Sequence, residues 1–319
     1  MFTRTLGRSG IEVSAMGLGC WAIGGPAWRG DQPIGWSKVD DAESIRAIHR
    51  ALELGVNFFD TANVYGCGHS EEVLGRALAG RRDKAVLATK FGPVFDPQTK
   101  QATGQDASPA AIRSACEASL RRLRTDVIDL YQLHIGNLGL DEATVVRDTL
   151  EELVAAGSIR WYGWSTDDAA RARLFADGPH CTGIQQRLNV FDGDPETLAV
   201  CEENNLAAIV RTPLAMGLLT GKFTHSSKLP ADDVRGRWDF SSGEQAGKLA
   251  KLHQLRELLT TGDRTLAQGA LCWLWARSDN TIPIPGFKTI RQVEENAGAM
   301  DFGPLKDAQM RQIDNILAE

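Results

Sequence analysis

Short apolar segments alternate with amphipathic segments along nearly the whole chain, and this alternation constrains the fold more than any other feature. Each apolar segment is typical of a buried parallel strand, and the stretches between them carry apolar residues at helical spacing. The predicted strands are residues 13–19, 57–60, 84–89, 127–133, 159–164, 182–186, 206–211 and 281–284. Eight strands alternating with helices predict an α/β protein of the (β/α)8 TIM-barrel type, as a single domain over residues 1–319.

The other segments add detail to this prediction. Residues 2–14 indicate a β-hairpin, with Gly10 at its turn, that caps the bottom of the barrel. Residues 91–108 and 215–243 are longer than usual connections in this fold, and both follow a strand. They can wall a substrate pocket or fold over a cofactor, and plain surface decoration is the alternative. The predicted helices are residues 41–54, 70–79, 109–123, 142–156, 167–176, 195–204, 244–260, 265–277, 289–299 and, at the C-terminus, 306–317.

Composition excludes several classes of protein. A net charge of −6 and a pI of about 5.6 argue against a nucleic-acid-binding or membrane-binding surface. No apolar run approaches the ~20 residues of a membrane span, and the N-terminus lacks the apolar region of a signal peptide. The six cysteines are scattered without a C-x-x-C pair, so neither a metal site nor a disulfide framework is expected, and a reducing cytoplasm is the expected location.

Polar side chains with acid–base chemistry stand at the ends of three predicted strands. Asp60 ends the strand 57–60 and Tyr65 follows five residues later, while Lys90 and His134 come at the ends of the strands that follow. Each residue alone also fits a solvated or structural side chain. Together they predict one site, because the carboxyl ends of barrel strands meet at one face.

The four side chains suit proton transfer to or from an oxygen atom. The ordinary pKa of tyrosine is ~10, and the Lys90 ammonium is expected to lower the pKa of Tyr65 by stabilising the phenolate. Asp60 would keep Lys90 charged, and His134 can hydrogen-bond a substrate oxygen. No strong nucleophile or metal-ligand set accompanies them, so a hydride would have to come from a cofactor.

The same residues lie in segments that resemble the aldo-keto reductase family. The resemblance covers nearly the whole chain, and its segments are GRSGIEVSAMGLGCW, NFFDTANVYG, TKFG, LYQLH, GWST, IQQRLN, RTPLAMGLLTGK and IPGFKTIRQVEEN, in this order. It implies an oxidoreductase of the alcohol dehydrogenase type that transfers a hydride between NAD(P)(H) and a carbonyl or alcohol. It also implies Tyr65 as general acid/base, Lys90 and Asp60 as the residues that tune it, and His134 as the residue that orients the carbonyl.

Cofactor binding is expected at loops and helix N-termini, because no G-x-G-x-x-G follows a strand. Gly217, Gly221 and Lys222 suit a pyrophosphate, while Lys288 and Thr289 at a helix start suit an adenosine 2′-phosphate. The resemblance implies further that Ser165 and Gln185 hold the nicotinamide carboxamide and that Glu295 and Asn296 contact the adenine. The full predicted set is Trp21, Asp60, Ser165, Gln185, Arg211, Pro213, Leu214, Gly217, Gly221, Lys222, Gly286, Lys288, Thr289, Gln292, Glu295 and Asn296.

Three positions depart from the family's pattern. Thr166 stands where Asn often follows the Ser of GWST, and Arg211 stands where an aromatic residue often stacks on the nicotinamide. The Arg211 guanidinium can stack on a ring in the same way, or bind a carboxylate or phosphate of the ligand. Gln292 stands where some members have an arginine for the 2′-phosphate. The prediction that NADP(H) is favoured, with NAD(H) possible, therefore rests on Lys288 and Arg291.

The expected substrate is a small aldehyde, ketone or sugar. Its predicted contacts are Trp21, Trp28, Phe91 and Trp238, with Trp36, Phe95 and Phe240 as further aromatic candidates. Two other functions stay open on the residues alone. Lys90 could form a Schiff base in an aldolase or isomerase, although a lysine kept charged by Asp60 is a poor nucleophile. The chain could also sense a cofactor without turning over a substrate. Its oligomeric state is not predicted.

Overall fold

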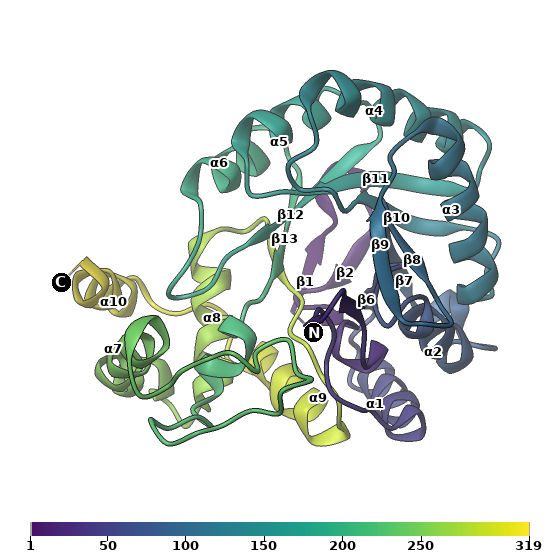
Figure 1. Cartoon of the computed structure of the whole chain (residues 1–319). Helices are drawn as coiled ribbons and strands as arrows, with labels where there is room; N and C mark the ends of the chain where they lie inside the picture. Colours follow the sequence, from purple (N-terminus) through teal and green to yellow (C-terminus); the bar gives the residue numbers. More distant parts are fainter. Residues whose placement is uncertain (1, 319) are drawn as a thin grey trace.

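The computed structural model describes residues 2–318 and contains a sheet of eight parallel strands. Neighbours in this sheet also follow one another along the chain, so a crossover joins each parallel pair. The barrel strands are β3 (Leu18–Gly19), β6 (Phe58–Asp60), β7 (Val86–Phe91), β10 (Ile128–Leu133), β11 (Ile159–Ser165), β12 (Cys181–Arg187), β13 (Ala207–Arg211) and β14 (Thr281–Pro283). A bridge between Gly19 and Gly286 joins the first strand to the segment after the last. The predicted (β/α)8 barrel is confirmed, with helices around the sheet (Figure 1).

All the predicted helices are present, with ends that differ from the prediction by less than one turn. Several of their N-termini carry side-chain caps, such as Asp40, Ser108 and Asp194, which accept backbone N–H groups of the first turn. Thr265 and Thr289 form capping boxes with a glutamine three residues later. The helices are α1 (Asp41–Glu53), α2 (His69–Ala77), α3 (Pro109–Leu123), α4 (Leu140–Ala155), α5 (Ala169–Ala176), α6 (Pro195–Glu203), α7 (Gly243–Thr260), α8 (Leu266–Arg277), α9 (Ile290–Ala297) and α10 (Asp307–Ala318).

Side chains of the barrel strands alternate between two apolar clusters. Phe58, Ala88, Leu130, Ile209 and Ile282 form part of the cluster inside the barrel. The neighbouring positions of the same strands join a larger cluster between the sheet and the helices. Because successive side chains of a strand point to opposite faces, a polar residue among the inward positions has no access to water except at the barrel's ends.

The N-terminal hairpin closes one end of the barrel as predicted. Its strands β1 (Thr3–Thr5) and β2 (Glu12–Ser14) pair antiparallel around Gly10, which has a left-handed φ of 70°. Leu6 and Val13 of this hairpin belong to the apolar cluster inside the barrel. The prediction of one strand over residues 13–19 is wrong, because the chain bends after β2. At Gly17 a Cβ atom would lie 2.8 Å from the carbonyl oxygen of Phe58, so the bend needs glycine there.

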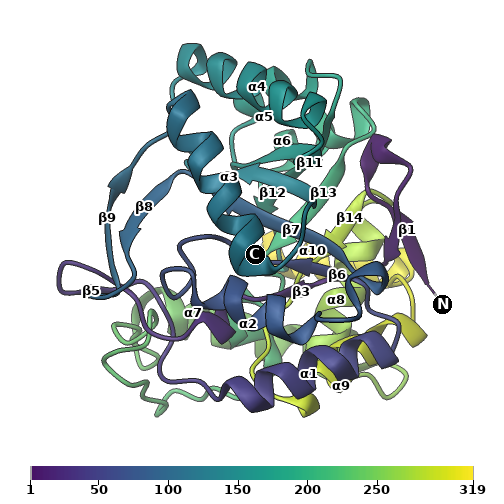
Figure 2. The ribbon, with the colours of Figure 1, turned by 90° about the vertical axis from the view of Figure 1, so that its right-hand side faces the viewer.

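A second sheet stands at the opposite end of the barrel, where the sequence predicted only loops. Residues 91–108 form the hairpin β8 (Pro93–Asp96) and β9 (Gln101–Gln105), and residues 20–38 contribute β4 (Trp28–Arg29) and β5 (Gln32–Pro33). The four strands pair in the order β5-β4-β9-β8, which satisfies part of the backbone of residues 20–38 and 91–108. Figure 2 shows this sheet and the N-terminal hairpin at opposite ends of the barrel.

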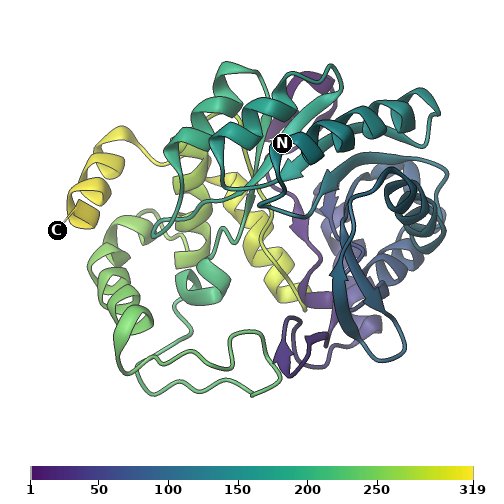
Figure 3. The ribbon, with the colours of Figure 1, turned by 45° about the horizontal axis from the view of Figure 1, so that its top comes forward.

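The long connection 215–243 begins with the 3-10 helix η4 (Ala215–Thr220) and then crosses to residues 20–38, where the N–H of Val234 donates to the carbonyl of Gly35 at 3.0 Å. After it, α7 packs against α8 and α10, so the C-terminal helix lies beside α7 outside the barrel (Figures 1 and 3). Among the described residues, no helix combines the length and the apolar character that crossing a membrane would require.

Candidate active site

Asp60, Lys90 and His134 meet at the carboxyl ends of three adjacent barrel strands. Asp60 is the last residue of β6, Lys90 lies near the end of β7, and His134 directly follows β10. The strands are in parallel register, with Asp60 opposite Ala88 and Lys90 opposite Gln132. Lys90 points to the inside because its neighbours Thr89 and Phe91 take the outward positions of the strand.

The Lys90 side chain is completely buried and has polar contacts with three residues. Its ammonium forms an ion pair with the Asp60 carboxylate, whose side chain is only 2% exposed. It also donates to the carbonyl oxygen of Thr61 at 2.8 Å and lies 3.5 Å from the phenol oxygen of Tyr65. Burial alone would lower the pKa of Lys90, but the neighbouring Asp60 and Tyr65 side chains outweigh it and raise this pKa. Lys90 is therefore a permanent cation beneath Tyr65.

Gln132, which the sequence analysis missed, helps to fix Asp60. The second carboxylate oxygen of Asp60 accepts from the side-chain amides of Gln132 and Gln185, both at 2.9 Å. The Gln185 amide also lies 3.2 Å from the Gln132 carbonyl oxygen. All three side chains are buried. A signal was present in the sequence, since Gln132 is a polar residue at an inward position of β10, two residues before His134.

The loop that carries Tyr65 is held in place by close backbone contacts. At Gly66, with φ of 57°, a Cβ atom would lie 1.9 Å from the carbonyl oxygen of Gly24, so no other residue fits. The N–H of Ser70 donates to the carbonyl of Tyr65 at 3.2 Å, and the Ser70 hydroxyl donates to the carbonyl of Cys20 at 2.7 Å. The loop thus places the half-buried phenol over Lys90.

The pKa of Tyr65 differs from the prediction. Burial raises the pKa of Tyr65 above its ordinary value, while the positive charge of Lys90 acts in the opposite direction and offsets part of the rise. The predicted net lowering is therefore wrong for the protein without ligands, because a phenolate costs more to desolvate than one nearby ammonium returns. The direction of the contribution from Lys90 agrees with the prediction.

His134 lies beside Tyr65 as a neutral imidazole. The two rings are 5.8 Å apart in an edge-to-face arrangement. Burial, the Lys90 cation and Arg211 lower the pKa of His134 to about 3. Its Nδ1 atom is buried and has no hydrogen-bond partner within residues 2–318. A neutral ring of this kind offers a donor or an acceptor to a ligand without adding a charge.

Trp21 and Arg211 complete the surroundings of Tyr65. The Trp21 ring stacks on Tyr65 with 5.9 Å between ring centroids, and it contacts Trp36 edge to face. Arg211 ends β13 and forms an ion pair with Asp167, which also accepts the N–H of Arg187 at 2.6 Å. This ion pair engages one side of the Arg211 guanidinium. The positive charge of Arg211 still lowers the pKa of His134.

Ser165 and Gln185 lie together at the ends of neighbouring strands. They are opposite one another in the register of β11 and β12, and both are buried. Thr166 follows, and its hydroxyl donates to the carbonyl of Gly136 at 2.8 Å. The Gln185 amide hydrogens are used by Asp60 and Gln132, so its carbonyl oxygen is the part that remains for a ligand.

Residues 213–222 form an irregular turn that fits a phosphate-binding role. Pro213 and Leu214 lead into the turn, and Met216 and Gly217 both have left-handed φ angles, of 52° and 100°. A Cβ atom on Gly217 would lie 3.1 Å from the ammonium nitrogen of Lys222, so this lysine reaches back over the glycine. Successive left-handed residues beside a cation match the concave, donor-rich backbone that binds anions. Gly221, with φ of 72°, ends the turn.

Arg235 supports this turn and was not found from the sequence. Its buried guanidinium forms two hydrogen bonds with the Asp233 carboxylate, at 2.8 and 2.9 Å, and donates to the carbonyl of Met216 at 2.9 Å. It also lies 4.3 Å from the Trp36 ring. Since Arg235 follows no strand and belongs to no motif, only the tertiary structure identifies it.

The α9 segment brings its predicted residues to one helix start. Thr289 caps the helix, and the Gln292 side-chain oxygen accepts the backbone N–H groups of Lys288 and Thr289. Gln292 therefore has a structural task at this position. The Lys288 ammonium donates to the carbonyl of Ser37 at 3.3 Å. Three further predicted residues belong to the same segment: Gly286 is exposed, Glu295 is partly exposed and Asn296 is buried.

Two predicted aromatic contacts are corrected by the structure. Phe91 is completely buried and stacks on Tyr131 at 4.6 Å between centroids, because it takes an outward position of β7, opposite to Lys90. Phe240 is 1% exposed and stacks on Phe223. Neither can line a substrate pocket. Trp238 packs edge to face on Phe240, while Trp28 lies half-buried in the outer sheet.

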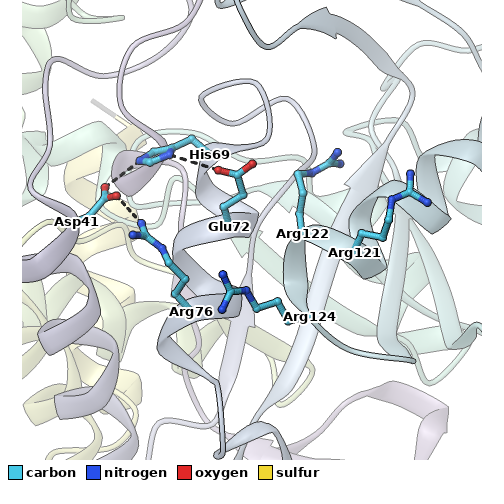
Figure 4. A pocket seen from close by; sticks show the side chains of 7 residues that line it. All are labelled: Asp41, His69, Glu72, Arg76, Arg121, Arg122 and Arg124. Atoms are coloured by element: carbon cyan, nitrogen blue, oxygen red, sulfur yellow. Dashed lines mark hydrogen bonds and ion pairs between the residues drawn. The ribbon is translucent and has the colours of Figure 1, made fainter.

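A surface cavity of about 470 Å³ lies apart from these residues. Figure 4 shows that acidic and basic side chains of α1, α2 and the end of α3 line it, and that Asp41 binds both His69 and Arg76. None of Asp60, Tyr65, Lys90 and His134 lines this cavity. The arginines at the C-terminal end of α3 also stabilise the negative end of this helix, so their presence beside the cavity has a structural explanation.

The family is settled by comparison with known proteins. The model of the Aldo/keto reductase family matches residues 15–318. The chain belongs to the aldo-keto reductases.

Three relatives illustrate the family. An NADH-specific methylglyoxal reductase of Escherichia coli is 32% identical, covering 95% of this chain and 94% of the relative. A glycerol dehydrogenase structure from Gluconobacter oxydans is 33% identical with a TM-score of 0.82, covering 97% of this chain and 92% of the other. An aldo-keto reductase structure from Klebsiella pneumoniae in complex with NADP and acetate is 26% identical with a TM-score of 0.71, covering 99% and 96%.

Proposed function

We propose that this aldo-keto reductase transfers a hydride between a nicotinamide cofactor and an aldehyde, ketone or sugar, with Tyr65 as general acid/base. The observation that carries the proposal is the position of Lys90, which is fully buried between the Asp60 carboxylate and the Tyr65 phenol. A cation fixed under a phenol stabilises the phenolate that remains when the proton leaves. This arrangement suits reversible protonation of an oxygen.

In the direction of reduction, the cofactor supplies the hydride to the carbonyl carbon. The Tyr65 hydroxyl donates its proton to the carbonyl oxygen, and Lys90 stabilises the resulting phenolate. Asp60, held by Gln132 and Gln185, keeps Lys90 charged and in place. Neutral His134 hydrogen-bonds the same oxygen and orients the carbonyl. In oxidation each residue performs the reverse task.

NADP(H) is the favoured cofactor, and NAD(H) is allowed. The turn at residues 213–222 fits the pyrophosphate, since its left-handed residues and Lys222 form an anion-binding concavity. Ser165, the free oxygen of Gln185 and Trp21 would hold the nicotinamide end, with Arg211 beside it. Residues 286–296 would hold the adenosine end. The Trp21 ring, which packs on Trp36, covers one face of the Tyr65 ring.

The Schiff-base alternative is disfavoured by the same site. An amine that attacks a carbonyl must be uncharged. The pKa of Lys90 is raised rather than lowered, since Asp60 and Tyr65 outweigh the effect of burial. Mass spectrometry after borohydride treatment with a carbonyl compound should therefore find no adduct on Lys90.

A substrate panel tests the proposed function. The purified protein is assayed with NADPH and NADH against methylglyoxal, an aryl aldehyde, a hydrophobic ketone and an aldose, and with NADP⁺ and NAD⁺ against glycerol. Turnover of at least one compound, lost in Tyr65→Phe, supports the proposal. Tight cofactor binding with no turnover in either direction would instead indicate a cofactor-sensing protein.

A further inference from the structure

The start of helix α9 is occupied by a carboxylate from another helix. The backbone N–H of Ile290, the first residue of α9, donates to the Glu43 side chain of α1 at 3.0 Å. The two helices lie side by side (Figures 1 and 2), and an ion pair between Arg50 and Glu294 joins them further along. The hydrogen bond from Ile290, followed by one from Arg46, lowers the pKa of Glu43, so this side chain is a carboxylate.

Three other backbone N–H groups at this helix end are also engaged. The N–H groups of Lys288 and Thr289 go to the Gln292 side chain, and the N–H of Gln292 goes to the Thr289 hydroxyl. Four N–H groups at the start of α9 are thus satisfied by groups of the protein itself, one of which is negatively charged. A phosphate bound here would have to lie near that charge.

Lys288, the cation predicted to bind the 2′-phosphate, is engaged by Ser37 and Trp36. The Lys288 ammonium donates to the carbonyl of Ser37 and lies 5.7 Å from the Trp36 ring. Burial, partly opposed by Asp233, lowers the pKa of Lys288. Arg46 of α1 forms an ion pair with Glu43 at 2.6 Å, and Arg291, the second cation predicted for this region, is exposed in the first turn of α9. Lys288 would attract a 2′-phosphate, and the Glu43 carboxylate at the same helix start would repel it.

We propose that Glu43 is a specificity-determining residue that limits the preference of this protein for NADP(H) over NAD(H). The inference rests on the proposed function, because it needs the adenosine end of the cofactor at residues 286–296. A 2′-phosphate carries up to two negative charges and is repelled by the carboxylate. The 2′-hydroxyl of NAD(H) carries no charge, and a carboxylate can accept a hydrogen bond from it. Glu43 acts on the difference between the two cofactors, not on the chemistry.

The test is binding, measured without turnover. Dissociation constants of NADPH, NADH, adenosine 2′,5′-bisphosphate and 5′-AMP are measured by tryptophan fluorescence or calorimetry for the wild type and Glu43→Gln. The variant should bind the two 2′-phosphorylated ligands about three- to tenfold more tightly, the size expected for one charge at a helix N-terminus. Its affinity for NADH and 5′-AMP should stay equal or fall.

Asp41→Asn is the matched control. Asp41 is an acid on the same turn of α1, but it binds His69 and Arg76 of α2 instead of α9 (Figure 4). Its loss should leave the ratio of NADPH to NADH affinity unchanged. An unchanged ratio in Glu43→Gln, or an equal shift in Asp41→Asn, would overturn the inference while leaving the proposed function standing. A wild type that binds neither cofactor would overturn both.

Discussion

Removing either charge of the buried Lys90–Asp60 pair should destabilise the protein. The two single losses of stability should add up to more than the loss in the double variant. The two side chains are 0% and 2% exposed, so neither charge can turn to water when its partner is lost. Lys90→Met leaves the Asp60 carboxylate with the amides of Gln132 and Gln185 alone. Asp60→Asn leaves the ammonium with the carbonyl of Thr61 and the Tyr65 phenol.

The structure sets the size of the effect. Breaking a buried ion pair by removing one partner typically costs ~3–5 kcal/mol, most of which comes from the unpaired charge that stays behind. The double variant contains no unpaired charge at this position. Because the groups are in direct contact, we expect a coupling in the upper part of the usual range, about 2–3 kcal/mol. The double variant should therefore be more stable than the sum of the single effects predicts.

Urea unfolding of the four proteins, followed by fluorescence and circular dichroism, measures this coupling. Coincident transitions by the two probes justify a two-state treatment. The exposed pair Arg113–Glu152, with side chains 45% and 63% exposed, is the control, and its coupling should lie within ~0–1 kcal/mol. Additive effects at Lys90 and Asp60 would refute the reasoning, because they would mean that Asp60 does not compensate the charge of Lys90.

Three further predictions concern Lys90, Lys288 and His134. Lys90→Met should raise the apparent pKa of the acid/base group in the pH–rate profile, since the cation that favours the phenolate is gone; an unchanged pKa would separate Lys90 from Tyr65. Lys288→Ala should weaken NADPH binding up to roughly tenfold and leave NADH nearly unchanged, because one charge-assisted contact opposed by Glu43 is lost; equal losses in fluorescence titration would assign Lys288 another ligand. His134 has a folded pKa of about 3, below its ordinary value, so the stability it contributes is present above ~pH 6.5 and is lost as the pH falls towards 3. His134→Gln should therefore lose less stability than the wild type between neutral and acid pH in urea unfolding.

The barrel could be predicted because its strands and helices differ in length and in the spacing of their apolar residues. Apolar runs such as residues 127–133 have no helical alternative of that length, and caps such as Asp40, Ser108 and Thr289 mark helix starts. The outer sheet could not be predicted in the same way. Its strands β4 and β5 have only two residues each, and the hairpin they form joins β9 through the pairing of Trp28 with Gln101, more than sixty positions away, so local patterns carry little information about the sheet.

Parts of the site depend on tertiary structure alone. Asp60, Lys90 and His134 follow strands, so their meeting at one end of the barrel follows from the fold. The rise in the pKa of Tyr65 depends on burial by the loop around Gly66, which no spacing predicts. Phe91 was misassigned because the apolar pattern of β7 does not distinguish its inward face from its outward face, and Lys90 identifies the inward face only once its contact with Asp60 is known.

Tyr65→Phe tests the central claim most directly when turnover and cofactor binding are measured on the same preparation. The variant should bind NADPH as the wild type does and lose turnover by ~100- to 10,000-fold, the usual contribution of general acid–base catalysis. Tyr131→Phe is the control, because Tyr131 is a buried phenol packed on Phe91 whose hydroxyl has no partner within the described chain. Turnover close to wild type in Tyr65→Phe, with Tyr131→Phe also active, would contradict the assignment of Tyr65 as the acid/base.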